Sequence, residues 1–162
     1  MTTKAERRRR QTGRSESGSF LAIPHAVLES DAYRTLSTHA IKLLFDLAAQ
    51  YRGKNNGDLA ATWRIMQPLN WRSRQTLERA LRELQEHGLI EKTRQGSLNK
   101  CNLFALSWRP IDACSSKLEV AASHTASGQW KTWQATPEKQ NASTPGVPAR
   151  HAHRVSTGRE AA

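Results

Sequence analysis

Apolar and polar residues recur with the period of an α-helix in two long stretches of the chain. One stretch spans residues 38–51 and the other 74–87, and each follows a serine of the kind that caps helix N-termini, Ser37 and Ser73. The apolar face of the first stretch holds Ile41, Leu44, Phe45 and Ala48, widened by Ala40, Leu43, Leu47 and Tyr51. The apolar face of the second holds Leu77, Ala80, Leu81 and Leu84. Gly88 then stands where helices commonly end, so the pattern predicts two amphipathic helices.

Shorter elements are expected around these two helices. In chain order they are a short helix from Pro24 to about Ser30, a short strand at 58–61, a short helix at 63–67 and a β-hairpin with strands at 89–94 and 101–108. The hairpin turn contains Gly96 and Asn99, residue types that favour turns. Asn70 lies where the chain should turn into the second long helix, because Asn tolerates a left-handed backbone conformation, and we expect the following Trp71 in the core.

The two ends of the chain lack this periodicity. Residues 1–19 are polar and residues 113–162 are rich in Ser, Thr, Ala, Gly and Pro, a composition typical of segments without a core. We therefore predict one domain at 20–112, flanked by a disordered basic arm at 1–19 and a disordered tail at 113–162. Two tail residues, Trp130 and Trp133, stand out; they anchor a partner, fold back on the domain, or are exposed to solvent without a role.

Basic charge is spread over the whole chain, whose net charge is +11. The arm carries six Lys/Arg against two Glu, the domain thirteen against nine acidic residues, and the tail six against three. Such a chain is attracted to polyanions, of which nucleic acid is the commonest. The run Arg7-Arg8-Arg9-Arg10 in the arm is interpreted either as a minor-groove contact or as a nonspecific electrostatic tether.

The predicted order of helix, strand, helix, turn, helix and hairpin is that of a winged helix-turn-helix domain, so the fold class is mainly α with a small β wing. In such domains the second helix of the pair, here 74–87, enters the DNA major groove. Side chains on its polar face that can read bases are Arg74, Gln75, Arg79 and Arg82. Candidates for contacts with the DNA backbone, at the helix entry and on the wing, are Arg72, Ser73, Lys92, Arg94 and Lys100. Three acidic residues, Glu78, Glu83 and Glu86, are interspersed, so the face is not purely basic.

Several sequence pieces carry a resemblance to a known family. They are Asn55-Asn56-Gly57-Asp58-Leu59, Ser73-Arg74-Gln75-Thr76-Leu77, Ala80-Leu81-Arg82-Glu83-Leu84, Gly88-Leu89-Ile90-Glu91, Gly96 and Phe104-Ala105-Leu106-Ser107-Trp108. The stretch from Leu36 to Trp108 resembles the winged-helix module of phage and plasmid replication initiators and replisome organisers, and more distantly winged-helix regulators of the multiple-antibiotic-resistance type. The resemblance implies that 74–87 is the recognition helix. The sequence departs from the family pattern at the turn before this helix, where the family usually has a glycine and this chain has Pro68-Leu69-Asn70-Trp71.

Other classes of function find little support in the residues. The carboxylates form no cluster for two-metal chemistry, and neither a phosphate-binding loop nor a recognisable Ser, His and Asp set is present. Cys101 and Cys114 form no Cys-x-x-Cys pair, which argues against a zinc ribbon. We expect no enzymatic activity, no cofactor and no bound metal. With no secretory signal and no apolar run of membrane-spanning length, we expect a cytoplasmic protein with reduced thiols.

The sequence therefore predicts sequence-specific binding of double-stranded DNA, by a replication initiator or accessory protein of a mobile element or by a transcriptional regulator. Replication or transcription proteins would then be partners of the tail. A second hypothesis is a winged-helix adaptor that binds proteins, with a nonspecific nucleic-acid-binding arm. A third is RNA binding through the arginine-rich arm. The oligomeric state and the DNA target stay open.

Overall fold

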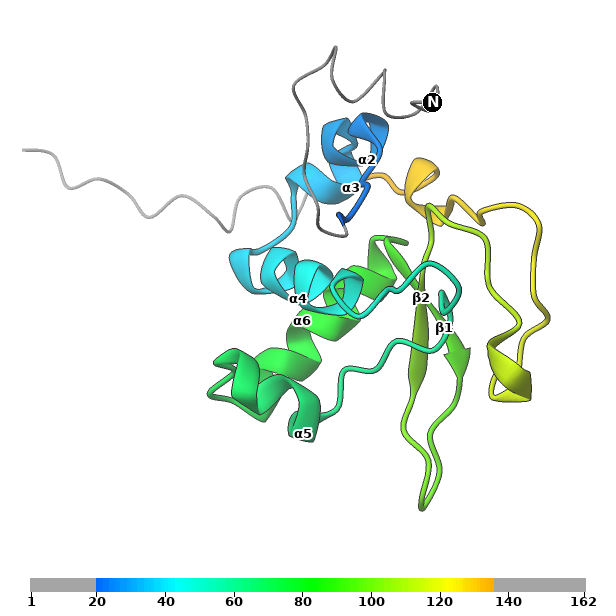
Figure 1. Cartoon of the computed structure of the whole chain (residues 1–162). Helices are drawn as coiled ribbons and strands as arrows, with labels where there is room; N and C mark the ends of the chain where they lie inside the picture. The colour runs from blue at the N-terminus through cyan, green and yellow to red at the C-terminus, as the bar shows by residue number, and fades with distance from the viewer. Residues whose placement is uncertain (1–19, 136–162) are drawn as a thin grey trace, which may run out of the picture.

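The computed structural model describes residues 20–135, which form a small helix-rich domain with a two-stranded antiparallel sheet (Figure 1). The longer helices are α4 (Thr38–Ala48) and α6 (Arg74–Glu86). The shorter ones are α2 (His25–Glu29), α3 (Asp31–Arg34), α5 (Trp63–Met66) and the 3₁₀ turns η1 (Gln67–Leu69), η2 (Cys114–Ser116) and η3 (Gln129–Lys131). The strands are β1 (Ile90–Arg94) and β2 (Leu103–Leu106). The predicted class, mainly α with a small β-hairpin, agrees with this architecture.

The two long helices begin where the sequence predicts. The Ser37 hydroxyl accepts a hydrogen bond from the Ala40 amide, and the Ser73 hydroxyl accepts one from the Thr76 amide, so both serines cap free N–H groups. The buried faces of α4 and α6 pack against each other and consist of Ala40, Leu43, Leu44, Leu47, Ala48, Leu77, Ala80 and Leu84. The prediction that Phe45 lies on the buried face is wrong. Phe45 is 43% exposed, because α4 buries the side of the helix that carries Leu43 and Leu47.

The hairpin continues directly from α6. Gly88 adopts a left-handed conformation with φ of 67°, as expected of a residue that ends a helix, and β1 begins two residues later. β1 and β2 pair antiparallel, with Ile90 opposite Leu106 and a register irregularity between Lys92 and Arg94. The strand predicted at 58–61 is reduced to one bridge, in which Leu59 and Phe104 exchange two backbone hydrogen bonds of 3.2 and 2.8 Å.

A buried asparagine fastens the loop after α4 to the far end of the hairpin. The Asn56 side chain is fully buried; its oxygen accepts a 2.7 Å hydrogen bond from the Leu106 amide, and its nitrogen donates to the Pro110 carbonyl at 2.8 Å. The backbone amide of the same residue donates to the Asp112 carboxylate. A buried amide with its partners in place fixes the loop in one arrangement, so this contact sets where the hairpin stands relative to α4.

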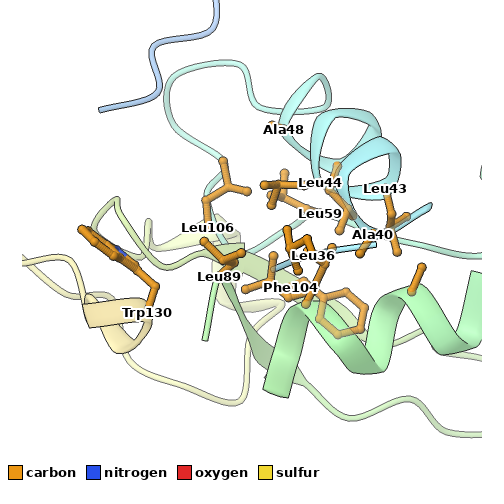
Figure 2. Close-up of a cluster of buried hydrophobic side chains, with 14 of the residues drawn as sticks. Leu36, Ala40, Leu43, Leu44, Ala48, Leu59, Leu89, Phe104, Leu106 and Trp130 are labelled. Carbon is orange, nitrogen blue, oxygen red and sulfur yellow. The ribbon is translucent and has the colours of Figure 1, made fainter. Parts of the chain in front are cut away.

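The core lies between the two long helices and the sheet. Figure 2 shows α4 side chains directed toward Leu59, Phe104 and Leu106, with Trp130 at the edge of the same cluster. Trp130 is only 9% exposed although it comes from the segment that we predicted to be disordered. The core therefore draws on a part of the chain that has no periodic pattern of its own.

Ordered structure continues beyond the boundary predicted at residue 112. Residues 113–135 run back along the domain, where the Glu119 amide donates to the Thr93 carbonyl and the Gly128 amide donates to the Ser107 carbonyl. Of the roles considered for the tryptophans, the structure shows the second, folding back on the domain. The prediction failed because composition averages over a segment, whereas one large aromatic side chain in a fitting site can hold it. Residues 1–19, with the arginine run, and residues 136–162 lie outside the described part of the chain.

Candidate nucleic-acid interface

The polar face of α6 is open to solvent, as predicted. Arg74, Gln75, Arg79 and Arg82 are all exposed, and they lie on the side of the helix opposite Leu77, Ala80 and Leu84. Within residues 20–135, neither the Arg79 nor the Arg82 guanidinium has a hydrogen-bond or ion-pair partner. These two cations are therefore available to an external ligand.

One of the three acidic residues on this helix is removed from the polar face. The Glu83 carboxylate accepts hydrogen bonds from both the Ser37 amide, at 2.6 Å, and the Ser37 hydroxyl, at 2.7 Å. It thus completes the N-terminal cap of α4 from a neighbouring helix, as a capping-box glutamate does from within its own helix. Glu78 and Glu86 remain exposed. Glu83 keeps its negative charge, but its carboxylate is engaged by the Ser37 cap.

The start of α6 is organised by an aromatic ring on α5. The Arg74 guanidinium lies 5.4 Å from the centre of the Trp63 ring, a cation–π distance that restrains the arginine. Arg72 is exposed beside it. Ser73 acts as the helix cap, and its hydroxyl keeps its proton for donation to another group. Arg64, next to Trp63, is a further exposed arginine near this site, and it was not among the predicted residues. Its position on the short helix before the turn could have indicated it.

The turn that leads into α6 is clamped to α4. Asn70 has the expected left-handed conformation, with φ of 66°, and the following Trp71 is buried as predicted. The Trp71 indole N–H donates to the Asp46 carboxylate at 2.7 Å. The Lys42 ammonium binds the same carboxylate at 2.6 Å and also donates to the Leu69 carbonyl. This contact set holds the turn without the glycine that the family resemblance leads one to expect.

The hairpin offers fewer free cations than predicted. Arg94 does not extend into solvent: its guanidinium donates to the Cys101 carbonyl at 3.1 and 3.2 Å and to the Lys117 carbonyl at 3.3 Å. Its role is to brace the hairpin, because an arginine fork fits carbonyl groups that converge around it. Lys92 and Lys100 are exposed, and the Lys92 ammonium contacts only the Gln95 side chain within the described residues. These two lysines are the hairpin cations left for a ligand.

Two further titratable groups next to the hairpin belong to the structure. The Asp58 carboxylate accepts a 2.6 Å hydrogen bond from the Lys117 ammonium and raises the pKa of Lys117. Burial, together with the nearby Asp58 and Asp112 charges, raises the pKa of the Cys114 thiol, which therefore stays protonated and is a poor nucleophile.

The tryptophans predicted as partner anchors are occupied. Trp130 packs in the core, and the Trp133 ring stacks on the His87 imidazole with ring centres 4.1 Å apart. His87 is itself buried, and its Nδ1 lies 2.7 Å from the Ala32 carbonyl oxygen. These rings hold residues 113–135 against the end of α6.

Comparisons with known proteins do not identify the chain: no family model, no curated protein and no solved structure matches it. Within residues 20–135 there is no helix long and apolar enough to span a membrane. The same residues contain no group of three or more His, Cys, Asp or Glu side chains that could hold a metal ion. The candidate interface therefore rests on the geometry of α6 and the hairpin.

Proposed function

We propose that this protein is a winged helix-turn-helix protein that binds double-stranded DNA in a sequence-specific manner, with α6 in the major groove. The observation that carries the proposal is the exposed face of α6, where two arginines without partners in the described residues lie beside Gln75 and the restrained Arg74. Arginine reads guanine and glutamine reads adenine through paired hydrogen bonds. The face thus carries the side chains that base recognition requires.

The surroundings of α6 support the same reading. Lys92 and Lys100 on the hairpin, and Arg72 at the helix start, are exposed and suit phosphate contacts that orient a protein on the duplex. The Glu83 carboxylate is engaged by Ser37, which leaves Glu78 and Glu86 as the exposed acidic residues of this helix. Arginines also occur in protein-binding surfaces, but here they lie beside Gln75 and between the cations of the helix start and the hairpin, so DNA is the ligand that we propose.

For the biological setting we rely on the family resemblance. It favours a replication initiator or accessory protein of a mobile element, or else a transcriptional regulator. The protein would act in the cytoplasm, where its two free cysteines stay reduced. Any partner of the C-terminal region would have to bind groups other than Trp130, because that side chain is buried in the core.

Selection of duplexes from a random DNA pool, with the full chain at near-physiological salt, tests the proposal. We expect a defined motif, and we expect Arg79→Ala and Arg82→Ala each to weaken binding of that motif by about 1–3 kcal/mol. Arg34→Ala is the matched control, since Arg34 is an exposed arginine on α3 and should be neutral.

Failure to enrich any motif would contradict sequence-specific recognition. Weak, salt-sensitive binding without a motif would favour the adaptor with a nonspecific arm. If Arg34→Ala weakens binding as much as Arg79→Ala does, the assignment of α6 as the reading helix is wrong.

A further inference from the structure

The tip of the hairpin presents a leucine to solvent. Leu98 is 99% exposed, more than any other large apolar residue in the described part of the chain. It sits in a tight turn in which Ser97 and Lys100 exchange two backbone hydrogen bonds of 2.9 and 3.1 Å. An isolated exposed leucine is common on proteins, so its meaning depends on what holds it and what surrounds it.

The hairpin that carries Leu98 is braced on both strands. The Gly96 amide donates to the Asn102 side chain across the turn at 2.6 Å, and the Arg94 guanidinium bonds the Cys101 carbonyl. From outside the hairpin, the Glu119 carboxylate accepts a 2.9 Å hydrogen bond from the Gln95 amide. These bonds restrain the backbone on both sides of the leucine, and a restrained backbone lowers the entropy lost when the side chain enters a binding site.

The charge around the leucine indicates the kind of ligand. The exposed charges of the hairpin itself are Lys92 and Lys100, since Arg94 is turned inward, and one carboxylate, that of Glu119, reaches the Gln95 amide from outside. Two exposed lysines beside an apolar tip suit a DNA duplex. Its phosphates are negatively charged on the outside, and its stacked base pairs are apolar between their faces. In Figure 1 the tip projects from the same end of the molecule as α5, the helix that contacts the start of α6 through Trp63, and away from α2 and α3.

We propose that Leu98 is a wedge that enters the minor groove next to the α6 site, inserts between two base pairs and bends the duplex. Apolar side chains inserted in this way unstack a base step and kink DNA by on the order of 20–90°. Lys92 and Lys100 would hold the flanking phosphates. This inference rests on the proposed DNA binding, and it adds a deformation of the duplex that α6 alone does not require.

The test uses the full chain and the duplex recovered by selection, labelled at its two ends for energy transfer and carrying 2-aminopurine at successive steps. We expect wild type to bring the ends closer and to raise 2-aminopurine fluorescence at one step. Leu98→Ala should remove both signals and weaken binding by roughly ten- to a hundredfold, the value of burying a side chain of this size. Leu98→Met, which keeps an apolar tip, should retain them, and Val120→Ala, at an exposed aliphatic residue off the tip, should behave as wild type.

Leu98→Lys separates insertion from simple phosphate attraction. The wedge predicts loss of the bend even though a cation has been added, whereas a purely electrostatic wing would bind more tightly with the bend unchanged. A straight duplex under wild type, or an equal bend under Leu98→Ala, overturns the wedge while DNA binding stands. No binding to any duplex overturns both proposals. Binding to phosphatidylserine vesicles that is lost in Leu98→Ala, with DNA bending intact, overturns the wedge in favour of a membrane surface.

Discussion

Helix α6 and the segment 113–135 are attached to the same domain by different means. α6 buries a continuous face against α4, whereas the segment is attached through separate contacts along its length, among them the Glu119 and Gly128 amides and the Trp130 and Trp133 rings. A continuous face spreads its stabilisation over many contacts and cannot open without exposing the core. A segment held at separate points can open at one of them while the others stay in place. We therefore expect single substitutions to open the segment locally and to leave α6 folded.

The largest effect is expected in the continuous face. Leu84 is fully buried, and Leu84→Ala should lower the free energy of unfolding by about 2–5 kcal/mol because it leaves a cavity. Leu81, one turn earlier and only half-buried, provides the comparison, and Leu81→Ala should cost less. Urea denaturation followed by circular dichroism measures both. Equal losses at the two positions would show that the burial of each leucine does not determine how much it contributes to the free energy of unfolding.

Trp130→Ala should come next in size and should act locally. We expect a loss of about 2–4 kcal/mol, below that of a central core tryptophan, because the buried indole N–H has no acceptor within the described residues. Hydrogen exchange of the Gly128 amide, which bonds the Ser107 carbonyl, reports release of the segment. Amides of α6 should keep their protection. Simultaneous loss of protection in α6 would show that the two regions unfold as one unit.

Gly88→Ala tests how closely the segment approaches the end of α6. A Cβ at this left-handed position would lie 2.8 Å from the Gln129 carbonyl carbon and 2.9 Å from the Trp130 amide nitrogen. Gly53 provides the matched control, since it also has positive φ but a Cβ there would meet nothing within 4 Å. Both substitutions carry a backbone strain of about 1 kcal/mol. Only Gly88→Ala should also increase exchange at Gly128; equal exchange in the two variants would contradict the close contact.

The smallest expected effect concerns the cap that joins α6 to α4. Glu83→Ala removes the acceptor of the Ser37 amide and hydroxyl and should cost about 0.5–2 kcal/mol, the range for lost helix caps. Glu78→Ala is the control, because Glu78 is an exposed glutamate on the same helix and should leave the melting temperature unchanged. A melting temperature that falls equally in both variants would assign the effect to helix charge and not to the cap.

Much of α6 could be predicted because its signals are local. The serine cap, the period of Leu77, Ala80 and Leu84 and the terminal glycine all lie within one stretch, and that period also assigns the arginines to the outer face. The site was predicted less well at the hairpin, where Arg94 and Lys100 look alike in sequence. Only the position of the Cys101 and Lys117 carbonyls turns the first inward and leaves the second exposed.

By itself the sequence determined the long helices, their caps, the left-handed Asn70 and the exposure of the α6 arginines, because each depends on neighbours within a few residues. Only the tertiary structure decided that Glu83 caps α4 through Ser37, 46 residues away, and that Asp46 holds the Trp71 indole. It also decided that Trp130 joins the core. These contacts bring together groups that are distant along the chain, and no periodic pattern records which of the available polar or aromatic partners will meet once the helices have packed.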